Sequence, residues 1–461
     1  VGGNMQKETE QKKRKQMEKF DMLGKHPGRA LIFFAVPMIL GNLLQQFYNM
    51  ADSVIVGRFV GEDALAAVGA SYSLTTVFIM IAIGGGVGAS VIISQYLGAK
   101  EYTKMRTAIS TALLTFLAIS VILAGFGLFA NRAILSSLKT PANILEDAVL
   151  YLNIYFMGLP FLFMYNVLSS IFNALGKSNI PLYLLMFSTV LNIALDLVAV
   201  IVFQKGVAGV AVATVFAQGI ASVLSFWILL RRLKEYEGED TPKKYDVEIL
   251  GNMVKIAIPS IIQQSIVSIG MLLVQSVVNG FGSSVVAGYS AGMRIESICI
   301  VPMIAMGNAI STFTAQNIGA GQTDHVKKGY RTAHGIVFAF AVVICVTLLL
   351  LKKQIISMFV GNESSLAFQT GSSYLSFIAY FFVCIGLKAL TDGVLRGAGD
   401  VVVFTLANLC NLAVRVSIAF ICAPLWGVQA VWYAVPLGWM TNYIISFARY
   451  LTGKWERKRL I

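Results

Sequence analysis

The chain has 461 residues, of which 57% are hydrophobic and 13% are charged, and its formal net charge is +13. A soluble domain has about 25% charged residues, so this composition excludes an ordinary soluble protein and indicates a polytopic membrane protein. The five cysteines lie inside apolar runs without a CxxC pair, and the three histidines show no metal-ligand or catalytic-triad spacing. We therefore expect neither an enzymatic activity nor a bound cofactor.

Hydropathy predicts twelve transmembrane helices, since about 20 apolar residues cross a bilayer. They lie at about 30–57, 65–95, 105–130, 148–173, 179–203, 207–230, 254–280, 286–316, 329–351, 371–395, 401–423 and 427–450. Residues 1–29 and 451–461 form basic tails, and 231–253 is the only long polar stretch in the middle. The predicted fold is an all-α polytopic membrane protein with an N-lobe at 30–230, a linker at 231–253 and a C-lobe at 254–450.

Lysine and arginine are distributed unevenly between the two sides of these spans. Of the 36 Lys and Arg residues, 27 fall on the side of the tails and the linker, six on the other side and three at membrane depth. Because basic segments remain in the cytosol, both termini are predicted to be cytoplasmic, in a multi-pass protein of the cell (plasma) membrane. The basic charge thus sets topology, and we expect contact with the lipid bilayer and none with nucleic acid.

The two halves resemble each other at a nearly constant offset. The pairs are Pro37 and Pro259, Phe59 and Phe281, Gln95 and Gln316, Tyr151 and Tyr374, Gly176 and Gly399, and Asn192 and Asn411. Six helices per half is an even number, so both halves enter the membrane from the same side. The sequence therefore predicts two six-helix lobes related by a parallel pseudo-two-fold repeat, a layout typical of transporters that alternate access.

The first span contains a proline and an acid. Pro37 removes one backbone hydrogen bond and marks a place where this helix can bend. Asp52 lies near the other end, and a carboxylate in a spanning helix costs at least about 2.5 kcal/mol. Asp52 is therefore predicted to be functional, unless it lies in headgroup water at the helix end.

Charged residues at membrane depth differ between the halves. The first half contains Asp52 and Asp196 without a basic residue to neutralise them. The second half contains Arg294, Glu296, Lys388, Asp392 and Arg415. Lys388 and Asp392 are four residues apart on one helix and are expected to pair. Two desolvated carboxylates without a counter-ion must bind protons or a metal cation, so the first half is predicted to contain a cation site.

Polar residues at a similar depth extend this site. Asn192 lies on the helix face of Asp196, and Thr214 of the next span lies near the same level. Carboxylate, amide and hydroxyl oxygens suit Na⁺, held by Asp52, Asn192, Asp196 and Thr214, or a proton shared within a hydrogen-bonded network. A polar helix-packing network without a ligand is the alternative.

The Pro37 to Asp52 span, the Asn192 to Asp196 run with Thr214, the Gly98-Ala99 loop and the stretch 394–400 resemble the MATE (multidrug and toxic compound extrusion) transporters. The resemblance covers about residues 20–450. It implies a two-lobe secondary active antiporter that exports organic, often cationic, compounds or other drugs in exchange for H⁺ or Na⁺. It also implies a cation-binding site formed by Asp52, Asn166, Asn192, Asp196 and Thr214. Members with an ion site in the C-lobe use acids in spans 7 and 10, and span 7 here has none, which argues against coupling there.

The substrate cavity is expected between the lobes of a monomer. Candidate apolar and aromatic lining residues are Phe47, Tyr48, Met271, Tyr289 and Met303, although plain helix packing explains each of them individually. The alternative function is a lipid-linked precursor flippase, which would use membrane-depth Arg294 and Arg415 to bind pyrophosphate. The sequence does not name the substrate, choose between H⁺ and Na⁺, or say whether the charges of the C-lobe take part.

Overall fold

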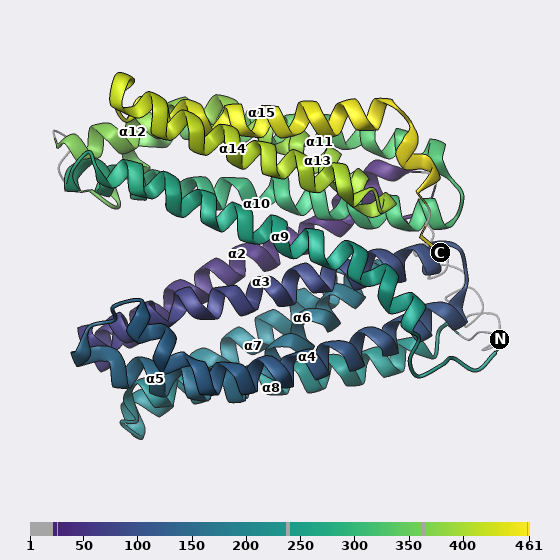
Figure 1. Ribbon diagram of the computed structural model, residues 1–461, viewed down its shortest axis with the longest axis horizontal. Helices are drawn as coiled ribbons and strands as arrows, with labels where there is room; N and C mark the ends of the chain where they lie inside the picture. Colours follow the sequence, from purple (N-terminus) through teal and green to yellow (C-terminus); the bar gives the residue numbers. More distant parts are fainter. Residues whose placement is uncertain (1–21, 25, 237–239, 361–364, 459) are drawn as a thin grey trace, which may run out of the picture. The chain divides into compact units, whose positions relative to one another are not determined.

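The computed structural model describes residues 22–24, 26–236, 240–360, 365–458 and 460–461, and within these ranges the chain is helical and contains no β-strand (Figure 1). The helices of the first half are α2 (Pro27–Ile55), η1 (Val56–Val60), α3 (Glu62–Gly98), α4 (Tyr102–Ser137), α5 (Ala142–Met157), α6 (Leu159–Ala174), α7 (Asn179–Leu197), η2 (Val198–Val202) and α8 (Gly206–Leu233). Those of the second half are α9 (Val247–Asn279), α10 (Ser283–Gly319), α11 (Thr323–Ser357), α12 (Leu366–Ile378), η3 (Ala379–Phe381), α13 (Phe382–Ala398), α14 (Val401–Trp426), α15 (Gln429–Leu451) and η4 (Lys454–Arg457).

These helices fall at the twelve predicted spans. Ten helical segments of the described chain are long and apolar enough to cross a membrane by themselves. The pair α5 and α6 forms another span with a bend of 53° between its helices. The remaining long helix, α15, lies at the twelfth predicted span. The predicted all-α, twelve-helix membrane fold is therefore confirmed.

The chain forms two compact units that do not coincide with the predicted lobes 30–230 and 254–450. The N unit comprises Leu40–Ile261, and the C unit comprises the described residues up to Ile39 together with Ile262–Ile461. Both boundaries lie inside a helix, in α2 and in α9, shortly after the prolines of the two repeats, Pro37 and Pro259. The start of α2 thus belongs to the C unit, and the start of α9 belongs to the N unit.

The predicted linker 231–253 is part of the N unit because hydroxyl groups of α4 bind its backbone. The Ser110 hydroxyl donates to the Lys244 carbonyl at 2.7 Å. The backbone N–H of Asp246 donates to the Thr111 hydroxyl at 3.1 Å. These bonds hold the described end of the linker along α4, immediately before α9 begins.

Glycines let α9 approach α3 within the N unit. A Cβ atom on Gly84 would lie 2.7 Å from the backbone nitrogen of Ile261, and one on Gly88 would lie 2.5 Å from the Met253 carbonyl oxygen. Both contacts are closer than a real Cβ atom tolerates, so these glycines allow the two helices to pack backbone to backbone. Gly84 and Gly88 therefore have a packing role.

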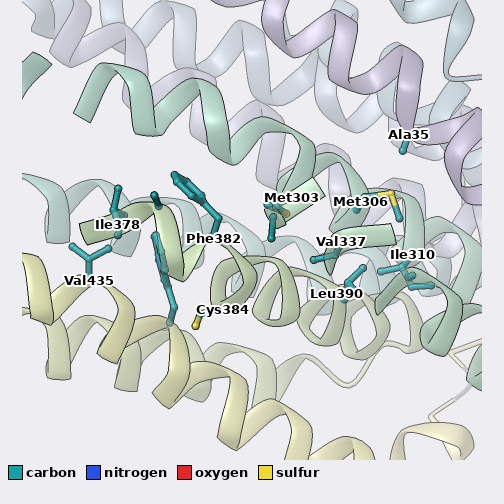
Figure 2. Packing of buried hydrophobic residues seen from close by; sticks show 14 of the residues in the cluster. Ala35, Met303, Met306, Ile310, Val337, Ile378, Phe382, Cys384, Leu390 and Val435 are labelled. Atoms are coloured by element: carbon teal, nitrogen blue, oxygen red, sulfur yellow. The ribbon is translucent and has the colours of Figure 1, made fainter. Parts of the chain in front are cut away.

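The C unit has one large apolar core. It includes Met22, Leu31 and Phe34 from the beginning of the described chain, together with residues of α10 to α15. Figure 2 shows part of this core, in which Met303 and Phe382 are buried. The helices α10 and α13 pack closely here, since the same backbone-to-backbone approach occurs where α13 glycines meet α10 carbonyls.

The backbone repeats in the two halves. Residues with positive φ lie at the junctions between corresponding helices, at Gly61 and Gly282, at Lys100 and Gly321, at Gly176 and Gly399, and at Gly206 and Gly427. The offsets of these pairs are 221 to 223 residues, as in the sequence comparison. The duplication inferred from the sequence therefore extends to the backbone conformation of the turns.

Candidate functional site

Two aspartates of the N unit lie on two different helices in similar local settings. Asp52 is in the last turn of α2, and Asp196 is in the last turn of α7. Each helix then continues as a five-residue π-helical turn, η1 after Asp52 and η2 after Asp196, and these two turns contact each other. A π-helical turn widens the helix and is frequent at functional sites. The contact between the two turns brings the two acids together.

The carboxyl groups of Asp52 and Asp196 lie within hydrogen-bonding range of each other. Asp196 is fully buried and Asp52 is half-buried. Two carboxylates have no donor between them, so a hydrogen bond that joins them needs one proton. One oxygen of Asp52 is buried without a hydrogen-bond partner among the described residues. This arrangement can hold a proton, and it offers an acceptor oxygen to a small cation.

Neutral polar groups surround the two acids. The Asn192 side chain donates to the Thr214 hydroxyl at 3.3 Å, and Tyr48 lies within hydrogen-bonding range of the same hydroxyl. Tyr48 and Tyr151 lie close enough to both aspartates to interact with them electrostatically. The structure thus joins four of the five predicted residues, Asp52, Asn192, Asp196 and Thr214, into one cluster within the N unit.

The basic residues nearest to the acids in the sequence point elsewhere. Arg58 is part of η1 and has an exposed side chain, and Lys205, which follows η2, is exposed as well. Water screens an exposed charge and therefore reduces its effect on a buried carboxyl group. The local charge of the site comes from its two carboxyl groups.

Asn166, the fifth predicted residue, has a different role in the structure. Its amide donates to the Leu162 carbonyl of its own helix at 2.9 Å, and its own carbonyl accepts from Ser170 at 3.0 Å. No described contact joins it to the aspartates. The placement of Asn166 in the site therefore stays a prediction.

The five candidate lining residues of the cavity lie in different environments. Tyr48 belongs to the aspartate cluster, and Phe47 and Met271 have exposed side chains. Tyr289 and Met303 are buried in the core of the C unit. The predicted cavity between the lobes stays a prediction, and packing within the C unit accounts for Tyr289 and Met303.

Two buried aspartates of the C unit have basic partners. Lys388 forms the predicted ion pair with Asp392 at 3.0 Å, and Ser446 and Asn408 also donate to Asp392. Asp400 forms an ion pair with Arg449 at 2.5 Å. The buried acids of this unit thus differ from the pair in the N unit, where one carboxyl group faces another.

Comparisons with known proteins give the family of this chain. The family model MatE matches residues 37–198 and again residues 259–421. The chain belongs to the MatE family. The two matches account for most of the chain, and they explain why the halves of this MatE protein repeat at an offset of about 222 residues.

Relatives of this MatE protein cover nearly its whole length. The chain is 29% identical to the "Probable multidrug resistance protein YpnP" of Bacillus subtilis (strain 168), over 96% of this chain and 99% of the relative. It is 23% identical to the "FAD transporter" of Shewanella oneidensis, over 92% and 93%. An outward-facing multidrug resistance MATE family transporter has the same fold, with a TM-score of 0.83 and 24% identity over 94% of this chain and 96% of that one.

Two features of the MatE site were missed by sequence reasoning. The sequence marks Tyr151 as a repeat position, and a tyrosine inside a span is in addition a polar group that needs a partner. The π-helical turns η1 and η2 share no pattern in the sequence, since η1 has the residues VGRFV and η2 has the residues VAVIV. The two acids themselves were detectable because charge inside a span is rare.

Proposed function

We propose that this MatE protein is a secondary active multidrug efflux antiporter that exports organic, often cationic, compounds in exchange for H⁺ or Na⁺. The observation that carries the proposal is the pair of carboxyl groups, Asp52 and Asp196, within hydrogen-bonding range of each other inside the N unit. Such a pair exists in the apolar region only when it binds a cation. The names of relatives such as YpnP support drugs as substrates.

The pair also provides a way to couple ion binding to helix movement. Asp52 is on α2 and Asp196 is on α7, so the bond between them ties two helices together. Side chains of α2 between residues 40 and 54 are half-buried or exposed, and α2 lacks one backbone hydrogen bond at Pro37. We propose that cation entry and release change this tie, alter the packing of α2 and thereby change the affinity for substrate.

In this proposal the protein works as a monomer in the cell (plasma) membrane, with both termini in the cytoplasm. Na⁺ would be held by the carboxylate oxygens of Asp52 and Asp196 together with oxygens of Asn192 and Thr214. A proton would be held between the carboxyl groups themselves. The same residues serve both ions, so the choice between them needs an experiment.

The experiment uses the full chain in proteoliposomes loaded with ethidium, a fluorescent organic cation. Efflux is driven in turn by a pH gradient and by a Na⁺ gradient, with wild type, Asp52→Asn, Asp196→Asn and the matched control Asp63→Asn, whose side chain is exposed. At ion gradients that saturate the wild type, we expect wild-type efflux by the control and strongly reduced efflux by both aspartate variants. Efflux at the wild-type rate by Asp196→Asn would overturn the proposal.

The flippase alternative is tested with the same vesicles. It needs basic groups that are available for pyrophosphate, but Arg415 lies within hydrogen-bonding range of Tyr289 and interacts electrostatically with Glu296. A fluorescent lipid-linked pyrophosphate is therefore expected to stay in its leaflet. Release of FAD from loaded vesicles, suggested by the name of the Shewanella relative, forms a further arm of the experiment.

A further inference from the structure

The C unit contains a buried carboxyl group that the proposed function does not use. Glu296 of α10 is 3% exposed. It accepts a hydrogen bond from the Tyr374 hydroxyl of α12, which is its one hydrogen-bond partner among the described residues. The helix α10 is long and apolar enough to cross a membrane, and a carboxyl group inside such a helix is a candidate functional group.

No ion pair neutralises Glu296. Each ion pair between described residues of the C unit joins other acids to their bases, and Arg415 of α14 and the Cys299 thiol interact with Glu296 only electrostatically. Lys388 of α13 pairs with an aspartate of its own helix at 3.0 Å, and Lys352 of α11 donates to a serine hydroxyl at 2.9 Å. A buried carboxylate is stable only with a paired charge and several hydrogen bonds. The neutral carboxylic acid is therefore the favoured form of Glu296.

The Tyr374 hydroxyl has a second acceptor beside the carboxyl group. It lies 3.4 Å from Sδ of Met293, which is three residues before Glu296 on α10. A tyrosine hydroxyl has one hydrogen to donate, and its oxygen can also accept. When Glu296 is protonated, its O–H can donate to the Tyr374 oxygen while Tyr374 donates to Met293. When Glu296 is ionised, the Tyr374 O–H can donate to the carboxylate, so rotation of one hydrogen keeps Glu296 hydrogen-bonded in both states.

Packing holds the Tyr374 ring in place beside Glu296. A Cβ atom on Gly292 of α10 would lie 2.6 Å from Cδ1 of this ring, so the missing side chain at Gly292 makes room for the tyrosine. The Tyr289 ring packs edge-on against it at 5.2 Å, and the Trp432 ring does so at 5.9 Å. Tyr374 is fully buried. The hydroxyl hydrogen can therefore turn between its two acceptors while the ring stays fixed.

We propose that Glu296 and Tyr374 form a second proton-binding site, in the C unit, at which Glu296 is a carboxylic acid at neutral pH and releases its proton reversibly to water. In that step the O–H bond of Glu296 breaks and its electron pair stays on the carboxylate. The Tyr374 hydrogen turns toward the carboxylate without leaving its own oxygen. One carboxyl group and one hydroxyl group supply few oxygens for a metal cation, whereas a proton needs only one. The inference goes beyond the proposed function, since it requires neither drug export nor the aspartate pair.

The test measures infrared spectra of the purified full chain, in which Asp52→Asn and Asp196→Asn remove the carboxyl groups of the N-unit site. Into this background is placed Glu296→Gln or the matched control Glu62→Gln, whose side chain is exposed. At neutral pH we expect a carboxylic-acid C=O band that Glu296→Gln loses and the control keeps. This band should disappear as the pH is raised and return when the pH is lowered. A band that survives Glu296→Gln, or that no alkaline pH removes from the folded protein, would overturn the inference.

Tyr374→Phe in the same background tests the hydroxyl group, and it keeps the test decisive should Glu296→Gln fail to fold. A hydrogen bond to a charged acceptor is stronger than one to a neutral acceptor, so loss of the hydroxyl disfavours the ionised form of Glu296. We expect Glu296 to bind its proton about tenfold more tightly in Tyr374→Phe, and equally tightly in the control Tyr380→Phe, whose side chain is exposed. An unchanged proton affinity in Tyr374→Phe would overturn the inference. No step of this test involves transport, so failure of the proposed function would appear separately, in the efflux experiment.

Discussion

Replacement of Asp196 by asparagine tests the central feature of the site with a small change in shape. Two negative charges about 4 Å apart repel each other by about 4 kcal/mol at an effective dielectric constant of about 20. This repulsion is relieved when a cation binds, so it strengthens cation binding by a factor of up to about a thousand, at about 1.4 kcal/mol for each factor of ten. Asp196→Asn removes the repulsion and one of the two ligands. We therefore expect the ion concentration for half-maximal efflux to rise by up to that factor.

The measurement is the initial rate of ethidium efflux from proteoliposomes against the external ion concentration, with Asp63→Asn as the control. The same loss is expected for Asp52→Asn, because the repulsion belongs to the pair. The reasoning is refuted if the half-maximal concentration of Asp196→Asn lies within about threefold of the wild-type value, which is less than 1 kcal/mol. It is also refuted if the two single variants differ from each other by as much as each differs from wild type.

Three further predictions concern the structure around the site. Ser110→Ala removes a hydrogen bond of about 1 kcal/mol between α4 and the linker. Trypsin should therefore cleave after Lys244 about fivefold faster. An unchanged cleavage rate would contradict the binding of the linker to α4. Backbone N–H groups at the start of α9, that of Ile249 above all, and the Lys243 side chain lower the pKa of Asp246. The stabilisation that the Asp246 carboxylate gives to α9 is therefore present above the ordinary pKa of about 3.9 and lost as the pH falls through the lowered pKa. Asp246→Ala should reduce the free energy that protects the first turn of α9 from hydrogen exchange by about 1 kcal/mol at pH 7. This difference should disappear in strong acid. Gly393→Ala would place a Cβ atom 2.3 Å from a carbonyl oxygen of α10 and should destabilise the C unit by about 1–3 kcal/mol in thermal unfolding, whereas the control Gly251→Ala, with open space around it, should be neutral or stabilising.

The features that the membrane imposes on this protein could be predicted from sequence patterns. The spans could be predicted because a segment that crosses the bilayer must be long and apolar, and the duplication could be predicted because paired residues recur at one offset. Asp52 and Asp196 were identifiable because each is an acid without a neighbouring base, and the rise per residue placed them at one depth. Their proximity depends on the helix order and on the π-helical turns.

Other features depend on contacts that have no sequence pattern. The linker was predicted to separate the halves because it is polar, but the hydroxyls of α4 hold it within the N unit. The Tyr374 hydroxyl of α12 donates to Glu296 of α10, so only the fold could reveal that this carboxyl group has a partner. The rise per residue sets Asn166 deeper than the acids, and the family resemblance implies it in the site; the described hydrogen bonds of Asn166 lie within its own helix, so its place in the site stays a prediction.

The unit boundaries inside α2 and α9 have a consequence for either half of the chain taken alone. Each half of the chain contributes the first segment of its first helix to the unit formed mainly by the other half. Leu31 and Phe34 are buried in the core of the C unit, and Met253 and Ile256 are buried in the N unit. Either half taken alone would leave this apolar segment without the core that it enters here. Two copies of one half could bury it only by exchanging these segments, as in a domain-swapped dimer.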